Sequence, residues 1–382
     1  MPGLVYMVEI PVSGRVLTWA RKFRGLSPIE AADAIGVTEA ELREFENEAR
    51  KPTLTKFEKM GAVYQLPLAT LFRRTPPDEP KELPDYRTFE GAPPRQSYEF
   101  RVALSNVRTW QAALRVLRAD DERFFGAILR QYDLRKDPFR QAEDERSEIG
   151  ISIKRQLDWK AGDGFRHWRA VIERLGISVY LQKFELQDCR GCSLLEDGII
   201  PAILINKAES ENAWTFTLIH EYAHLLIRRP GISDLNRRNP VEVFCNRFAA
   251  SFLMPVAALR RVLPHWPDGP LNWEDATINN AARDLKVSAQ ALAIRLEELG
   301  RAKPGFNAQF IRKPTKKKAT GGGYVRTRLS EIGGRFTASV MNALDRDVID
   351  SVHASEALGL GPPYLERARA YVERQRELAS AG

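Results

Sequence analysis

One stretch, residues 216–255, constrains this chain more than any other. It reads FTLIHEYAHLLI and, after a loop, PVEVFCNRFAASFLMP. The first half places His220, Glu221 and His224 in an apolar run without Gly or Pro, which predicts a helix. Residues four apart share one helix face, so both imidazoles can reach one metal ion. Glu221 is offset by about 100° and can reach a water molecule on that ion instead.

Two histidines do not complete a catalytic zinc site, which usually takes three protein ligands and leaves a fourth position for water. Glu242 begins a second helical pattern just after Pro240, and proline suits the first position of a helix. We predict that Glu242 is the third ligand. Asn246 lies one turn further along on the same face, where we expect it to accept the free N–H of one ligand imidazole and fix its tautomer.

The paired segments resemble the ImmA/IrrE family of zinc metallopeptidases, whose pattern is FTLxHExxH followed by ExxA/CNxFAAxxLMP. The positions that fit this pattern are Phe216, Thr217, Leu218, His220, Glu221, His224, Glu242, Cys245, Asn246, Phe248, Ala249, Ala250, Leu253, Met254 and Pro255. The resemblance implies a zincin-like peptidase domain with Zn²⁺ as its cofactor. The structural alternative is a buried helix with two hydrogen-bonded histidines.

Length and composition bound the chain only loosely. Its 382 residues predict two or three domains, and a hydrophobic content of 43% suffices for ordinary cores. No apolar run reaches about 18 residues, and the N-terminus lacks a basic start. We therefore expect neither a transmembrane helix nor a signal peptide, and no membrane partner. A net charge of +8 permits contact with nucleic acid without demonstrating it.

The three cysteines are a sparse, odd set, which indicates a reducing cytoplasm. Cys189 and Cys192 form CRGC, but a structural zinc knuckle would need a second pair. We interpret this motif as a loop feature. Cys245 falls on the apolar side of the second helix and is expected in the core.

Residues 14–74 carry five short helical patterns. Thr38, followed three residues later by Glu41, predicts a capping box at the third of them. The sequence RKPT, Arg50–Thr53, precedes the fourth. This unit resembles the helix-turn-helix domain of the XRE/Cro-repressor family, which implies that its third helix enters the DNA major groove.

That third helix is acidic for a DNA-reading element, with Arg43 as its main base. Its carboxylates, which phosphates would repel, belong to Glu39, Glu41, Glu44, Glu46 and Glu48. DNA contact through residues 14–74 and recognition of protein, including a homodimer, both stay open. No DNA-binding residue is assigned.

The remaining sequence predicts four further regions. A proline-rich linker and long helices occupy residues 75–147, and the zincin-like peptidase with a trailing helix-turn-helix-like pair occupies 148–300. A basic flexible linker follows at 301–323, then a helical C-terminal domain at 324–382. The predicted fold class is therefore α+β and mostly helical, with a small sheet.

Residues 177–181, 193–196 and 199–206 are the strand candidates. In zincin-type metallopeptidases an edge strand beside the active-site helix pairs with extended substrate. Our candidate for this substrate strand comprises Ile203, Leu204, Ile205 and Asn206. The alternative is an ordinary strand within the sheet.

The expected reaction is zinc-dependent hydrolysis of a peptide bond, with Glu221 as general base. Tyr222 and His265 are visible donors for the oxyanion, but neither matches a motif, so that role stays unassigned. The resemblance implies that the substrate is a helix-turn-helix repressor of stress or mobile-element genes. The alternative is a DNA-binding transcriptional regulator, or an antitoxin-like module, whose peptidase site is weak or unused.

Overall fold

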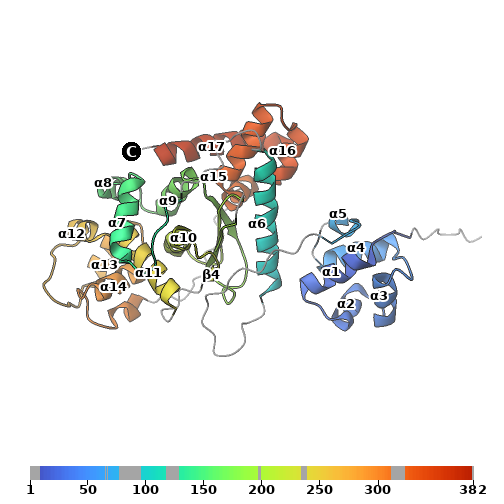
Figure 1. The fold of residues 1–382 in the computed structure, drawn as a ribbon, viewed down its shortest axis with the longest axis horizontal. Helices are drawn as coiled ribbons and strands as arrows, with labels where there is room; N and C mark the ends of the chain where they lie inside the picture. The colour runs from blue at the N-terminus through green and yellow to red at the C-terminus, as the bar shows by residue number, and fades with distance from the viewer. Residues whose placement is uncertain are drawn as a thin grey trace, which may run out of the picture. The chain divides into compact units, whose positions relative to one another are not determined.

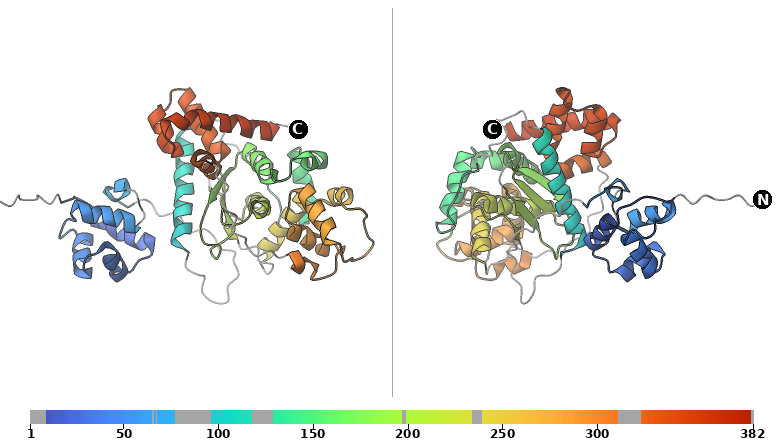
Figure 2. Two further views of the ribbon diagram at one scale, coloured as in Figure 1. Left: turned by 180° about the vertical axis from the view of Figure 1, so that it is seen from behind. Right: turned by 45° about the vertical axis from the view of Figure 1, so that its right-hand side comes forward.

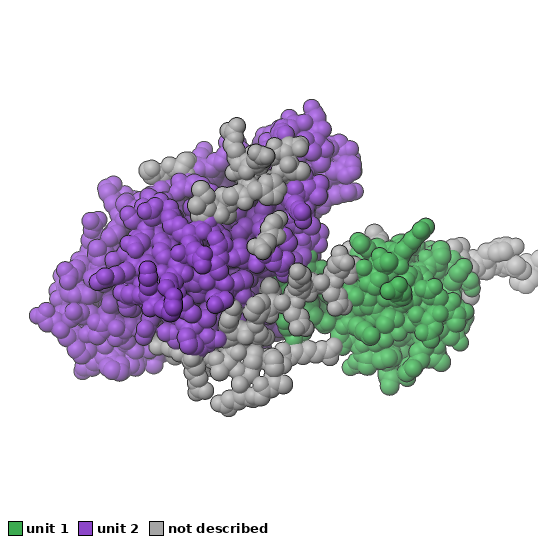
Figure 3. All heavy atoms as spheres, in the orientation of Figure 1, with its two compact units in different colours: residues 1–81, 96–105 green, residues 82–95, 106–382 purple. Residues whose placement is uncertain are grey.

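The structure is a computed structural model that describes residues 9–64, 66, 68–76, 96–117, 129–196, 199–233, 239–310 and 323–380. The chain divides into two compact units, residues 1–81 with 96–105 and residues 82–95 with 106–382 (Figure 3). Much of the predicted proline-rich linker, residues 118–128 of the predicted long helices, and residues 311–322 of the basic segment lie outside the described residues.

The first unit contains five short helices around one core, as the sequence predicts. They are α1 (Gly14–Arg24), α2 (Pro28–Ile35), α3 (Glu39–Glu46), α4 (Leu54–Tyr64) and α5 (Leu68–Leu71). A full capping box starts α2, formed by Ser27 and Glu30. At α3, Thr38 accepts from the Glu41 N–H at 3.1 Å. The Glu41 carboxylate pairs with Lys56, so we find only half of the capping box predicted there.

The long helix α6 (Tyr98–Leu117) contributes its first residues to the first unit and the rest to the second. In the first unit, the Tyr98 hydroxyl donates to the Tyr64 carbonyl at 2.6 Å. In the second unit, Trp110 packs against Tyr180 with ring centroids 5.0 Å apart.

The second unit is an α+β body with many helices and one small sheet, which confirms the predicted fold class. Its helices before the sheet are α7 (Pro138–Glu148), α8 (Ile153–Asp158) and α9 (Gly164–Arg174). The sheet region contains β1 (Ser178–Gln182), β2 (Gly191–Leu194), β3 (Ala202–Asn206), α10 (Glu211–Leu226) and β4 (Ile232–Ser233). Then come α11 (Pro240–Leu253), α12 (Val256–Val262), α13 (Asp275–Leu285), α14 (Ala289–Glu298) and the 3-10 helix η2 (Phe306–Phe310). The last elements are α15 (Tyr324–Asp345), α16 (Ser351–Leu358), the 3-10 helix η3 (Pro362–Tyr364) and α17 (Leu365–Ser380).

The sheet has four strands in the order β1-β3-β2-β4, with β1 parallel to β3 and the other pairs antiparallel. In Figure 1, α10 lies on one side of this sheet and α6 on the other. The contacts agree, because α10 packs on β2 and β3 while Trp110 of α6 packs on β1.

This order corrects the predicted substrate strand. Ile203, Leu204, Ile205 and Asn206 belong to β3, which pairs with β1 on one side and β2 on the other. All four residues are fully buried. A strand with both edges paired has no backbone groups left for an extended peptide. Asn206 instead organises a neighbouring loop, donating to the Cys189 carbonyl at 3.1 Å and accepting from the Ala208 N–H at 3.0 Å.

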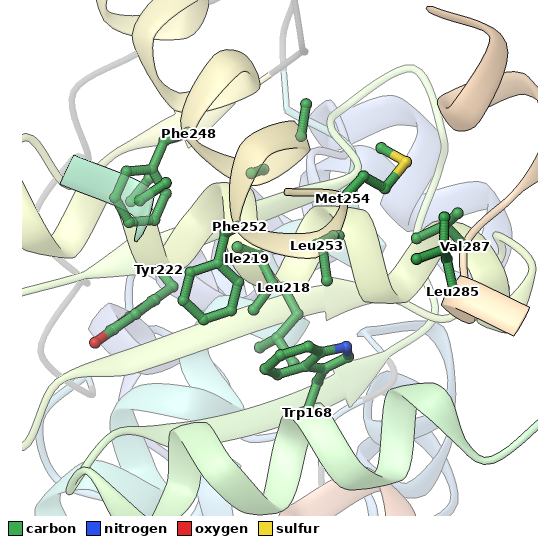
Figure 4. Close-up of a cluster of buried hydrophobic side chains, with 14 of the residues drawn as sticks. Trp168, Leu218, Ile219, Tyr222, Phe248, Phe252, Leu253, Met254, Leu285 and Val287 are labelled. Atoms are coloured by element: carbon green, nitrogen blue, oxygen red, sulfur yellow. The ribbon is translucent and has the colours of Figure 1, made fainter. Parts of the chain in front are cut away.

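The main core of the second unit lies where α9, α10 and α11 meet (Figure 4). Each large apolar side chain that leaves water here contributes about 1.5–3 kcal/mol. Labelled members of this cluster are Trp168 from α9, Leu218 and Ile219 from α10, and Phe248 and Phe252 from α11. The same packing therefore fixes the two helices that carry the predicted ligands.

The C-terminal helices α15, α16 and α17 form one group at an end of the second unit (Figure 2). Helix α15 packs against β1, the sheet edge opposite β4, and breaks at Gly333, where φ is 85° and ψ is 162°. At this break Glu173 accepts from the Gly334 N–H at 3.1 Å, and Arg169 donates to the Ser330 carbonyl at 2.6 Å. Buried charges from α9 thus complete the backbone hydrogen bonding of the broken helix.

Among the described helices, no single one has the length and apolar composition to cross a membrane, although α11 and α12 meet that test jointly across a bend of 46°.

Candidate metal centre

Both predicted ligand segments are helical, and their N-terminal caps explain where each helix begins. Ser210 caps α10 by accepting from the Ala213 N–H. Asn239 caps α11 by accepting from the Val241 N–H at 3.0 Å, with Pro240 at the first helical position. Glu242 consequently lies in the first turn of α11.

The structure brings the three predicted ligands together. His220, His224 and Glu242 form one cluster and are fully buried. The Nε2 atoms of the two histidines are 3.1 Å apart. Glu242 Oε2 lies 3.1 Å from His220 Nε2, and Oε1 lies 3.2 Å from His224 Nε2. Ligand atoms around a tetrahedral zinc ion, with bonds of about 2.0–2.1 Å, are about 3.3 Å apart, so the spacing fits one such ion.

The chemistry of these donors also fits a cation. The His224 Nδ1 lies 2.8 Å from the Arg229 carbonyl, which can only accept, so Nδ1 carries a proton and the neutral ring presents the Nε2 lone pair to the cluster. Neither buried oxygen of Glu242 receives a hydrogen bond from the described residues. Burial raises the pKa of the Glu242 carboxyl, but the two imidazoles, when they are protonated and donate to it, lower that pKa to about 2. A metal cation bound between this carboxylate and the two Nε2 atoms would take the place of those protons.

The sequence predicts Asn246 as the group that fixes a ligand imidazole, and this stays a prediction; for His224 the structure shows a backbone partner. The Arg229 carbonyl fixes the His224 ring by accepting from its Nδ1. The Arg229 N–H also donates to the His224 carbonyl at 2.9 Å, which holds the two backbones together. His220 Nδ1 is buried without a hydrogen-bond partner among the described residues. Asn246 is half-buried on α11. A backbone carbonyl leaves no mark in the sequence, so this partner could not be predicted.

Glu221 is fully buried on α10 and is not a member of the ligand cluster, as expected of a general base. It lies against β2, because a Cβ added at Gly191 would be 3.2 Å from Glu221 Cγ and 2.7 Å from Thr217 Cγ2. Gly191 therefore permits the close approach of α10 to the sheet. Burial raises the pKa of the Cys192 thiol, and the nearby Glu221 carboxylate raises it further. Gly191 and Cys192 of the CRGC motif thus lie on β2 beside Glu221, and the interpretation of the motif as a loop feature is wrong for these two residues.

The two visible oxyanion candidates lie elsewhere. The Tyr222 hydroxyl donates to the Glu145 carboxylate at 2.5 Å. His265 is exposed in a loop and stacks on Trp273, with ring centroids 5.1 Å apart. Neither contact directs these side chains to the cluster, and the oxyanion donor stays unassigned.

Removing the Glu242 charge should weaken metal binding. For Glu242→Gln we expect at least a tenfold lower Zn²⁺ affinity, because a neutral amide replaces the carboxylate that faces the two imidazoles. Competition with a chromophoric chelator measures this loss. The control is His353→Ala, which removes an exposed histidine of the C-terminal helices and should leave the affinity unchanged. Equal affinities for wild type and Glu242→Gln would exclude Glu242 as a ligand.

In the first unit, two of the carboxylates near the third helix form contacts within the unit. Glu46 binds Arg21 at 2.6 Å, with about nine-tenths of both side chains buried, and Glu48 accepts from the Gly14 N–H at 2.7 Å. These two glutamates therefore stabilise the unit itself. Arg43 of α3 keeps 64% of its side chain exposed beside Glu39.

The pair α13–α14 uses its cations for packing. Lys286 donates to the Leu157 carbonyl at 2.8 Å. Arg295 is 1% exposed and donates to Ser251 Oγ at 3.2 Å. These two side chains are therefore engaged within the second unit and do not contribute to a surface that could bind nucleic acid.

Comparison with known protein families gives two matches. Residues 172–297 match the family described as IrrE N-terminal-like domain, a peptidase family. Residues 17–71 match the family described as Helix-turn-helix. Both confirm the resemblances drawn from the sequence. Searches of curated proteins and of solved structures gave no match.

Proposed function

We propose that this chain, which carries an IrrE N-terminal-like peptidase domain after a helix-turn-helix domain, is a zinc-dependent metallo-endopeptidase that cleaves a helix-turn-helix repressor. The observation that carries the proposal is the buried cluster of His220, His224 and Glu242, with Glu221 beside it on α10. A repressor substrate would link cleavage to the expression of stress or mobile-element genes.

The roles of the residues follow from their positions. His220, His224 and Glu242 would hold Zn²⁺, which lowers the pKa of a bound water towards about 7 and polarises a carbonyl. Glu221 takes the proton from the attacking water and passes it to the leaving amine. The Arg229 carbonyl keeps His224 in the tautomer that presents Nε2.

Among the described strands, β4 is the end of the sheet that we propose for an extended substrate. At the other end, β1 packs against α15. β4 pairs with β2 and is the last strand in the sheet order on that side. β2 contains Gly191, whose backbone lies against Glu221. We propose that substrate adds antiparallel or parallel to β4, which brings its scissile bond near the cluster.

A cleavage assay tests this function. The purified chain, loaded with Zn²⁺, is incubated with the repressor encoded beside its gene, and fragments are identified by mass spectrometry. The proposal is supported if the fragments do not form in the presence of a chelator and form again when Zn²⁺ is added back. An intact repressor under both conditions contradicts the proposed substrate.

A second function, DNA-binding regulation, is favoured by the exposed Arg43 on α3 and by the internal pairing of Glu46 and Glu48. For this function we expect a salt-dependent gel shift on the chain's own promoter, because phosphate contacts release counterions. Arg43→Glu should weaken the shift at least tenfold, whereas Arg346→Glu, an exposed charge reversal in the other unit, should not. Absence of a specific shift at physiological salt would remove this function.

A further inference from the structure

A buried carboxylate outside the matched peptidase segment contacts the metal-binding helix. Glu145 of α7 is 1% exposed and precedes residues 172–297 in the chain. It accepts from the Tyr222 hydroxyl at 2.5 Å, from the Tyr132 hydroxyl at 3.0 Å and from Arg130 at 3.3 Å. Three donors therefore satisfy one buried anion, which makes this a complete polar network.

This network reaches α10 between its two ligands. Tyr222 directly follows Glu221 and precedes His224 by two residues. In Figure 4 its ring lies beside Phe252 of α11, and the hydroxyl points away from the labelled Trp168. The ring centroids of Tyr222 and Phe252 are 6.4 Å apart. Tyr222 thus touches both α11 and α7.

The same segment contacts the other parts of the site. Helix α7 packs directly against α11, which carries Glu242. Just before α7, the Tyr132 N–H donates to the Leu226 carbonyl at the end of α10, and Arg228 donates to the Leu129 carbonyl, both at 3.0 Å. Residues 129–148 therefore contact both ligand helices.

The separation of α10 and α11 sets whether three ligand atoms meet around one ion. Metal sites need their ligands within about 0.5 Å of the productive geometry, which requires packing and hydrogen bonds behind the ligands. We propose that Glu145 is a positioning residue for the metal centre: through Tyr222 and α7 it fixes α10 against α11 so that His220 and His224 face Glu242. This inference rests on the proposed metal function.

Three variants test it. Glu145→Gln keeps the shape but removes the anion, and Tyr222→Phe removes one hydroxyl while Glu145 keeps Tyr132 and Arg130. Glu148→Gln is the matched control, since Glu148 lies on the same helix and binds Arg130 but keeps 58% of its side chain exposed. The measurements are Zn²⁺ affinity by chelator competition, the visible spectrum of the Co²⁺-loaded chain, and the thermal midpoint.

We expect Glu145→Gln to lower Zn²⁺ affinity about tenfold or more and to change the Co²⁺ spectrum, which reports ligand geometry. Tyr222→Phe should change the Zn²⁺ affinity and the Co²⁺ spectrum in the same direction but by a smaller amount. Glu148→Gln should match wild type in both measurements. If either Glu145→Gln or Tyr222→Phe changes only the thermal midpoint, or nothing, the positioning role is wrong. If wild type binds no Zn²⁺ in this competition, the proposed function fails instead.

Discussion

Glu221→Gln is expected to keep the metal and to lose about 100- to 10,000-fold in peptide hydrolysis, the range that a positioned general base contributes. Glu221 lies outside the ligand cluster, so the ion loses no ligand. Glutamine has nearly the same shape, so the close packing of α10 against Gly191 should persist. The amide cannot accept a proton from water at neutral pH, and turnover should fall without a change in Zn²⁺ content.

The matched control is Glu211→Gln, which makes the same change at an exposed position in the first turn of the same helix. It should match wild type in both metal content and turnover. Turnover is measured on the cleaved repressor, and Zn²⁺ content by elemental analysis of the purified protein. If wild type and Glu221→Gln relieve repression equally in cells, the enzymatic function is contradicted and the result supports the regulatory function.

Gly333→Ala should destabilise the second unit by about 3 kcal/mol or more. The combination φ 85° and ψ 162° is open essentially to glycine, and strain of this kind costs about 1–3 kcal/mol. An added Cβ would also lie 2.6 Å from the Val179 carbonyl oxygen and 2.7 Å from Arg169 Nη2. Overpacking against a backbone atom adds about 1–3 kcal/mol.

Thermal unfolding measures this loss. The second unit comprises residues 82–95 and 106–382, and for a unit of this size a change of about 3 kcal/mol corresponds to a decrease of roughly 5 °C in the midpoint. The control is Gly269→Ala, where the added Cβ would meet nothing within 4 Å and φ is ordinary. A Gly333→Ala midpoint within a degree of that control would show that α15 can straighten or shift at no cost.

Local patterns predict the residues of the candidate metal cluster because these residues lie on two helices. His220 and His224 share a face by the period of α10, and Pro240 marks the start of α11 just before Glu242. That both helices would approach each other came from the family resemblance. The residues that set this approach, such as Glu145 and Gly191, lie far away in the sequence and carry no motif of their own.

The wrong predictions share one physical cause, which is that pairing between distant segments is invisible to periodicity. Residues 203–206 have the composition of a strand anywhere in a sheet, and only the order β1-β3-β2-β4 shows that both edges are occupied. Likewise, Thr38 and Glu41 have the spacing of a capping box, but the Glu41 carboxylate forms an ion pair with Lys56 of the next helix instead.

The burial of the whole cluster has a kinetic consequence. His220, Glu221, His224 and Glu242 are each 0% exposed, so an ion, a chelator or a substrate can reach them only when the structure around them opens locally. Exchange must wait for local opening, and its rate is then set by the frequency of that fluctuation. Metal loss in excess chelator should therefore become independent of chelator concentration, and protein loaded during folding should differ in occupancy from protein loaded afterwards.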